Sequence, residues 1–143
     1  MSAPVTSDEL VKRVLSQARV YAIVGASANP ARASYYVMEF LQNRGFKVVP
    51  INPGLAGQEL LGQTVYAALA DVPGPVDVVD IFRNSDAALD VTREAIAQSQ
   101  RLGLKAVWMQ LGVINETAAQ EAQAAGFDAV MDRCPKIELG RTP

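Results

Sequence analysis

The sequence predicts an α/β protein with a Rossmann-like, three-layer fold and a five-stranded parallel sheet in the order 3-2-1-4-5. Five short apolar segments, each typical of a buried strand, alternate with helical stretches along nearly the whole chain. The first of these strands runs through a glycine turn directly into a helix, a connection that open α/β sheets use to bind phosphate. Such alternation predicts helices on both faces of the sheet.

The predicted elements follow one another in a regular order. The strands are residues 20–24, 47–51, 76–82, 105–109 and 127–131. The helices are residues 8–18, 34–44, 85–102 and 115–126, with a short helix at 66–69 and an extended piece near 59–60. Pro50 cannot donate a hydrogen bond to a ladder, so we expect the pairing of the second strand to loosen there.

Residues at the helix ends support these boundaries. The candidate N-caps, whose side chains can accept hydrogen bonds from the first turn, are Ser7, Ser34, Ser85 or Asp86, and Asn115. The glycines that can end helices are Gly45, Gly103 and Gly126. We expect one domain over residues 1–143, with a core over about 7–135 and a polar C-terminal tail after it.

The composition is that of an ordinary globular protein. Half of the 143 residues are apolar and a fifth are charged. No apolar run approaches the roughly 18 residues that span a membrane. The first residues lack the basic and apolar regions of a signal peptide, so we expect a cytoplasmic protein. The single cysteine, Cys134, excludes an internal disulfide and any multi-cysteine zinc site.

The chain contains no histidine. This absence removes the commonest general base, the Ser-His-Asp triad, phosphohistidine chemistry and histidine metal sites, so we predict neither catalytic residues nor a metal. The net charge is −2 without a basic run, so we expect no nucleic-acid partner. The apolar content is compatible with a homodimer or with a protein partner.

Ligands of such sheets bind beyond the carboxyl ends of the strands, near the first strand. That rule selects the segments that follow the first four strands, which are residues 25–34, 52–53, 82–84 and 110–113. Each segment contains Gly, Pro, Asn or Arg rather than ordinary solvating charges. We therefore expect a nucleotide-type ligand at this edge of the sheet.

The first segment, which begins Gly25-Ala26-Ser27, carries the features of a phosphate site. Gly25 lets a ligand approach the backbone closely, and the helix that follows offers unpaired N–H groups. Ser27 and Ser34 can donate hydroxyl hydrogen bonds, and Arg32 adds a planar cation. In the alternative interpretation, Gly25 only makes the turn, Ser34 only caps the helix, and Arg32 is a solvated surface residue.

The segments differ from two familiar nucleotide motifs. The first loop has one glycine where a dinucleotide fingerprint has three, and it lacks the Gly-Lys-Ser/Thr of an NTP-binding loop. The second strand ends in Asn52 and Pro53 rather than in the acidic residue that holds an NAD ribose. These differences weigh against NAD binding and against ATP hydrolysis.

Three further residues admit a functional and a structural interpretation. Arg83 either pairs with a ligand phosphate or forms a salt bridge to Asp86 or another neighbour. Asp80 stands in a buried strand, where it is either an acid of raised pKa or, as we favour, a hydrogen-bond partner of a loop. Cys134 is either a reactive thiol or, as we favour, an inert small residue.

Five motifs, taken in order, resemble those of a known protein family. They are Val24-Gly-Ala-Ser-Ala-Asn-Pro30, Val49-Pro-Ile-Asn-Pro53, Val76-Asp-Val-Val-Asp-Ile-Phe-Arg83, Val107-Trp-Met-Gln-Leu-Gly-Val113 and Val130-Met-Asp-Arg-Cys-Pro-Lys-Ile-Glu138. These motifs are similar to those of small stand-alone bacterial CoA-binding proteins and of the N-terminal CoA-binding domain of the succinyl-CoA synthetase α subunit. The resemblance spans roughly residues 7–141. It implies a Rossmann-like domain that binds coenzyme A or a short acyl-CoA.

The resemblance also implies a role for each matching position. The pyrophosphate would be held by Gly25, Ala26, Ser27, Arg32 and Ser34. The nucleotide side would be lined by Asn52, Pro53, Phe82, Arg83 and Asn84, with Lys47 near the adenosine 3′-phosphate. The pantetheine arm would be approached by Gln110, Gly112 and Val113. The absence of an acidic residue after the second strand agrees with coenzyme A as the ligand, because a carboxylate there would repel the 3′-phosphate.

Three classes of function remain open. The resemblance favours a binding, sensor or partner module, and ligase chemistry is not expected because the chain stops at Pro143 without a phosphohistidine domain. A small acyl-CoA-dependent enzyme would need an acid or nucleophile, such as Asp80, Asp132 or Cys134, about 3 Å from the thioester. The third class is an NAD(P)-binding protein, in which Arg32 would meet the NADP 2′-phosphate.

Overall fold

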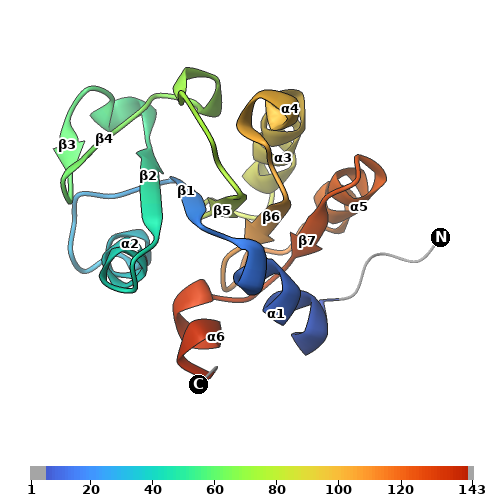
Figure 1. Cartoon of the computed structure of the whole chain (residues 1–143). Helices are drawn as coiled ribbons and strands as arrows, with labels where there is room; N and C mark the ends of the chain where they lie inside the picture. The colour runs from blue at the N-terminus through green and yellow to red at the C-terminus, as the bar shows by residue number, and fades with distance from the viewer. Residues whose placement is uncertain (1–5, 142–143) are drawn as a thin grey trace.

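A computed structural model describes residues 6–141 and contains the expected parallel sheet of five strands. From one edge to the other, these strands are β2 (Lys47–Ile51), β1 (Val20–Val24), β5 (Val78–Ile81), β6 (Ala106–Met109) and β7 (Asp128–Val130). Helices cover both faces, so the predicted Rossmann-like, three-layer architecture is confirmed (Figure 1).

The predicted strand order, 3-2-1-4-5, is wrong. The third strand of the sheet, β5, pairs directly with β1 from Tyr21↔Val78 to Val24↔Ile81, which gives the order 2-1-3-4-5. The outer side of β2 is occupied by the chain that follows it, where Ile51 forms a bridge with Tyr66. Because β2 is an edge strand of this sheet, Pro50 costs the ladder little.

The helices form two layers (Figure 1). One face is covered by α1 (Asp8–Gln17), α2 (Ala33–Asn43) and α6 (Pro135–Arg141), and the other by α3 (Ala87–Ala97), α4 (Ser99–Leu102) and α5 (Glu116–Ala124). A hairpin of β3 (Glu59–Leu60) and β4 (Gln63–Thr64), between the short helices η1 (Pro53–Leu55) and η2 (Leu69–Asp71), connects β2 to β5. No helix within residues 6–141 has the length and apolar character needed to cross a bilayer.

The core lies on both faces of the sheet because the strands are buried on both sides. In β1, for example, Val20, Ala22 and Val24 pack towards α3 and α5, whereas Tyr21 and Ile23 pack towards α1 and α2. This double burial explains why the strands are nearly continuous in apolar residues instead of alternating with polar ones.

Two of the predicted caps are confirmed and two are wrong. The side chains of Ser7 and Asn115 accept hydrogen bonds from the first turns of α1 and α5. Ser34 is the second residue of α2 rather than its cap, because the helix begins one residue earlier than predicted. Neither Ser85 nor Asp86 caps α3, since the amide of Ala87 donates to the side chain of Asn84 at 2.8 Å. The predicted long helix is divided at Gln98 between α3 and α4.

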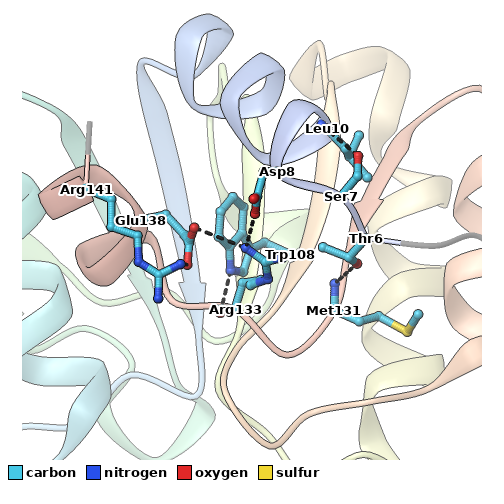
Figure 2. A network of polar contacts seen from close by, with 9 residues as sticks. All are labelled: Thr6, Ser7, Asp8, Leu10, Trp108, Met131, Arg133, Glu138 and Arg141. Carbon is cyan, nitrogen blue, oxygen red and sulfur yellow. Dashed lines mark hydrogen bonds and ion pairs between the residues drawn. The ribbon is translucent and has the colours of Figure 1, made fainter. Parts of the chain in front are cut away.

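The predicted polar tail is instead a helix that belongs to the core. In α6, Pro135 and Leu139 are buried, and Leu139 packs with residues of α1 and α2. Figure 2 shows the polar contacts that hold the start of α6, in which Arg133 bonds to Asp8 at 3.0 Å and to Glu138 at 3.1 Å. The indole of Trp108 in β6 donates to the carbonyl of Arg133 at 2.7 Å. These contacts fix α6 next to the carboxyl edge of the sheet.

Candidate ligand site at the carboxyl edge of the sheet

Two cavities lie next to each other at the carboxyl edge. The larger, of about 710 Å³, lies between α2, α6 and the ends of β5 and β6, and it is lined by Ala33, Tyr36, Val37, Phe40, Phe82, Arg83, Gln110, Leu111, Val113, Cys134, Lys136, Ile137 and Gly140. The smaller, of about 400 Å³, lies on the α3 side and is lined by Val24, Gly25, Ile51, Asn52, Pro53, Ala67, Ala68, Arg83, Val91 and Glu94. Arg83 lines both cavities, so its side chain stands where they meet.

The corrected strand order brings Gly25 and Arg83 together. In a 2-1-3-4-5 sheet the chain changes direction between the first and third strands, which here are β1 and β5. Gly25 follows β1 with a φ of +93°, and a Cβ atom on it would lie 2.4 Å from the carbonyl oxygen of Phe82 and 3.3 Å from Cδ of Arg83. Only glycine therefore allows the two loops to pack this closely.

The first loop is held by the end of β2. The amides of Gly25 and Ala26 both donate to the carbonyl of Ile51, at 3.0 and 3.1 Å. The side-chain amide of Asn52 donates to the carbonyl of Ala26 at 2.7 Å, and its oxygen accepts from the amide of Gly54 at 2.8 Å. Asn52 thus lines the smaller cavity and also orders the loop beside it.

The rest of the loop orders itself and leads into an open helix end. Ser27 accepts a hydrogen bond from the amide of Asn29 at 3.0 Å, and Asn29 accepts one from the amide of Ala31 at 3.0 Å. No side chain of residues 6–141 caps the amide groups of the first turn of α2. Ser34, in this turn, is only 5% exposed, whereas Arg32 before it is exposed. The predicted phosphate features therefore occur in one continuous segment.

No acidic side chain within the described part of the chain forms an ion pair with Arg83. Its expected alternative partner, Asp86, forms no ion pair with it, and the ion pairs within residues 6–141 join other residues. A guanidinium without an acidic partner at the junction of two cavities can meet a phosphate group.

Gln110 is the most unusual polar residue of the larger cavity. The residue is 5% exposed, and its side-chain carbonyl oxygen Oε1 has no hydrogen-bond partner among the described residues. A buried amide oxygen without a partner costs free energy, so a ligand N–H placed there would be stabilised. The backbone amide of Val113, which also lines this cavity, donates to the backbone carbonyl of Gln110 at 2.8 Å.

Seven predicted site residues line neither cavity, and they are Ala26, Ser27, Arg32, Ser34, Lys47, Asn84 and Gly112. Asn84 caps α3, and the amide of Gly112 donates to Asp132 at 2.7 Å, so both have structural partners. Lys47 begins β2 at the amino edge, opposite Val20, whereas the loop that carries Gly25 follows the carboxyl end of the sheet. Ile51 lies four residue steps along the strand from Lys47, a distance of about 13 Å. The structure therefore does not bring Lys47 to the other candidates.

The larger cavity contains residues that the sequence interpretation missed. Tyr36 and Phe40 follow Ala33 at helical spacing in α2, a pattern that could have indicated a shared face. Lys136 and Ile137 lie in α6, which was expected to be tail. The Nζ atom of Lys136 lies 5.1 Å from the ring centre of Tyr36 and 5.9 Å from that of Phe40, so aromatic faces hold the cation at the cavity wall.

Asp80 is buried beneath this site. It lies between Ile23 and Trp108 in the sheet, is inaccessible to solvent, and neither carboxylate oxygen has a partner among the described residues. The expected hydrogen bond to a loop is therefore not seen. Burial raises the pKa of Asp80 well above its usual value because the charged form is poorly solvated. Asp80 lines neither cavity, so it does not reach a ligand there.

Comparisons with known proteins identify similar chains. The model of a family described as a CoA binding domain matches residues 19–140. The uncharacterized protein YneT of Bacillus subtilis is 32% identical over 127 residues, which are 89% of this chain and 90% of YneT. A solved structure from Thermus thermophilus, cell-free ID.343, is 35% identical with a TM-score of 0.85, over 95% of this chain and 98% of that one. An acetyl-coenzyme A synthetase from Ca. Korarchaeum cryptofilum is 28% identical with a TM-score of 0.63, over 78% of this chain and 25% of that one.

Proposed function

Because the chain belongs to the family of CoA-binding domains, we propose that it binds coenzyme A across the two cavities at the carboxyl edge of the sheet. In this proposal the adenine base occupies the smaller cavity, the ribose lies at the mouth of that cavity, and the pantetheine arm enters the larger one. The pyrophosphate lies between them, against Arg83 and the start of α2. The domain acts as a binding, sensor or partner module without ligase chemistry of its own.

The position of Arg83 is the observation that carries this proposal. Coenzyme A has a doubly charged pyrophosphate between two dissimilar halves, so its site needs a cation between two compartments. Arg83 lines both cavities without an acidic partner within residues 6–141, and Arg32 adds a second exposed cation before α2. The uncapped helix end offers N–H groups and a favourable dipole to the same charge.

The larger cavity suits the pantetheine arm. This arm carries two amide groups on a largely apolar chain, and the lining combines apolar residues with Gln110. Oε1 of Gln110 lacks a partner and has almost no exposed surface, so a pantetheine N–H would satisfy it once the Gln110 side chain turned this oxygen towards the cavity.

One residue of the smaller cavity gives a reason to keep NAD as a second candidate. Glu94 of α3 lines this cavity, and its carboxylate accepts a hydrogen bond from the amide of Leu69 at 3.4 Å. An acidic residue can bind the hydroxyl groups of an NAD ribose, although it would repel the 3′-phosphate of CoA. The CoA proposal therefore requires this phosphate to point away from Glu94.

Titration calorimetry with CoA, dephospho-CoA and NAD tests the proposal. We expect both CoA forms to bind and NAD to bind far more weakly. Replacing Arg83 by Gln should weaken CoA and dephospho-CoA by the same factor, roughly 10- to 100-fold, because a charged hydrogen bond to the pyrophosphate is lost. A greater loss for CoA would place Arg83 at the 3′-phosphate instead.

Arg93 provides a matched control for the substitution of Arg83. Arg93 in α3 is also exposed but pairs with Glu121 at 2.8 Å and lines neither cavity. Arg93→Gln should leave both affinities unchanged. Equal losses for the Arg83 and Arg93 variants, or tight binding of NAD alone, would reject the proposed site.

A further inference from the structure

We infer that the preferred ligand is an acyl-CoA with an apolar acyl chain of about six carbons, and that this chain occupies the larger cavity beside α6. This inference rests on the proposed function, since it needs the CoA part to bind as described. It goes further in assigning the larger cavity to the acyl group as well as to the pantetheine arm.

The volume of the larger cavity exceeds the needs of the pantetheine arm. At roughly 30 Å³ for each non-hydrogen atom, the value for liquid water, a pantetheine arm of about 18 such atoms fills about 540 Å³. The cavity measures about 710 Å³. The remainder is about 170 Å³, which accommodates a chain of roughly six carbons by the same measure.

Exposed apolar side chains concentrate at the larger cavity. Within residues 6–141 the exposed large apolar side chains are Tyr36, Leu111, Ile114 and Ile137, and all of them except Ile114 line the larger cavity. Tyr36 is 43% exposed, Leu111 53% and Ile137 43%. Such clustering of exposed apolar side chains marks a binding surface rather than random surface composition.

The neighbouring charges favour a ligand that is apolar here and anionic next to it. Among the described residues that line the larger cavity, none is acidic. Arg83 joins this apolar space directly to the smaller cavity, so a single molecule with phosphates in the middle and a hydrocarbon end fits both. Lys136 lies over the rings of Tyr36 and Phe40, and its methylene groups extend the apolar wall.

Calorimetry with CoA, acetyl-CoA, hexanoyl-CoA, decanoyl-CoA and succinyl-CoA tests the inference. Hexanoyl-CoA has four more methylene groups than acetyl-CoA, and their burial in a partly open cavity should raise affinity roughly 10- to 100-fold. The gain should level off between six and ten carbons, because the space is then filled. Equal affinities for CoA and hexanoyl-CoA, or a greater gain for succinyl-CoA, would overturn the inference while the proposed CoA function stands. Failure of every CoA form to bind would reject both.

Variants at the mouth of the cavity locate the acyl chain. Ile137→Asp and Leu111→Asp place a carboxylate beside the chain, and both positions are exposed enough to accept it without loss of the fold. Each should lower the ratio of hexanoyl-CoA affinity to CoA affinity at least tenfold. Ile114→Asp is the matched control, since Ile114 is 49% exposed but lines neither cavity, and it should leave the ratio unchanged.

A second copy of the chain is the competing occupant of this apolar surface. Sedimentation of the ligand-free protein distinguishes it from the acyl chain. A dimer that Ile137→Asp dissociates, together with an unchanged affinity ratio, would assign the surface to self-association and overturn the inference. If Ile137→Asp and Leu111→Asp both lower the ratio of hexanoyl-CoA affinity to CoA affinity while the sedimentation coefficient stays the same, the acyl chain is the occupant of this surface.

Discussion

The close packing of the loops after β1 and β5 predicts a large cost for one added methyl group. In Gly25→Ala the new Cβ would lie 2.4 Å from the backbone oxygen of Phe82, which cannot move without disturbing β5. The residue also keeps a φ of +93°, which L-residues rarely adopt. The conformational strain costs about 1–2 kcal/mol and the overlap about 1–3 kcal/mol more, so we expect a total loss of stability of about 2–5 kcal/mol.

A second glycine separates these two contributions. Gly45, at the end of α2, has a φ of +92°, almost the same as Gly25, but no atom lies within 4 Å of its hypothetical Cβ. Gly45→Ala should therefore show only the conformational strain, about 1–2 kcal/mol. Urea unfolding followed by the fluorescence of Trp108, the single tryptophan, measures both variants in one assay.

Equal losses of stability in Gly25→Ala and Gly45→Ala would show that the overlap with the Phe82 backbone does not contribute, and would refute the close packing of the two loops. The Gly25 variant should also lose CoA affinity at least tenfold, because Phe82 and Arg83 must shift, whereas the Gly45 variant should bind normally. Intact binding by a destabilised Gly25 variant would separate the loop from the ligand site.

Three further variants test other parts of the structure. Burial raises the pKa of Asp80, so above about pH 4 the folded state keeps a proton that the unfolded state releases. The free energy of unfolding should then fall by up to about 1.4 kcal/mol per pH unit as the pH rises towards that pKa. Asp80→Asn should remove this slope. Parallel plots of unfolding free energy against pH for the wild type and the variant would contradict the burial argument. Leu139→Ala should lower the free energy of unfolding in urea by about 2–4 kcal/mol because α6 is part of the core. A negligible loss of stability would show that α6 behaves as a polar tail outside the core. Asn52→Ala removes the hydrogen bonds to Ala26 and Gly54 and should lower the free energy of unfolding by about 1–3 kcal/mol. It should also weaken CoA binding, and an unchanged CoA affinity in titration calorimetry would show that the loop does not need this support.

Much of the fold could be predicted because its signals are local. Each strand of a doubly covered sheet is a short apolar run, and the caps at Ser7 and Asn115 follow from their own side chains. The strand order was wrong because it depends on pairing between distant segments. Nothing in residues 76–82 shows that the outer side of β2 is already occupied by the chain around Tyr66.

The candidate site was predictable where it follows directly from a strand. Gly25, Asn52, Arg83 and Gln110 each come after a strand, and the structure places all of them at the two cavities. Lys47 was selected through the family resemblance alone, and its place at the start of β2 puts it at the opposite edge.

The wall that α6 contributes could not be predicted for a different reason. The helix has only seven residues, begins with a proline and carries three charged side chains, so no apolar period distinguishes it from a polar tail. Its position depends on long-range contacts of Arg133 with Asp8 and of Trp108 with the Arg133 backbone (Figure 2).

A crystal structure of the protein with CoA shows directly whether the two cavities bind this ligand. We expect the adenine base in the smaller cavity, the pyrophosphate within hydrogen-bond distance of Arg83, and the pantetheine arm beside Gln110 in the larger cavity. CoA bound elsewhere, or bound at this edge with its phosphates away from Arg83, would refute the proposed site.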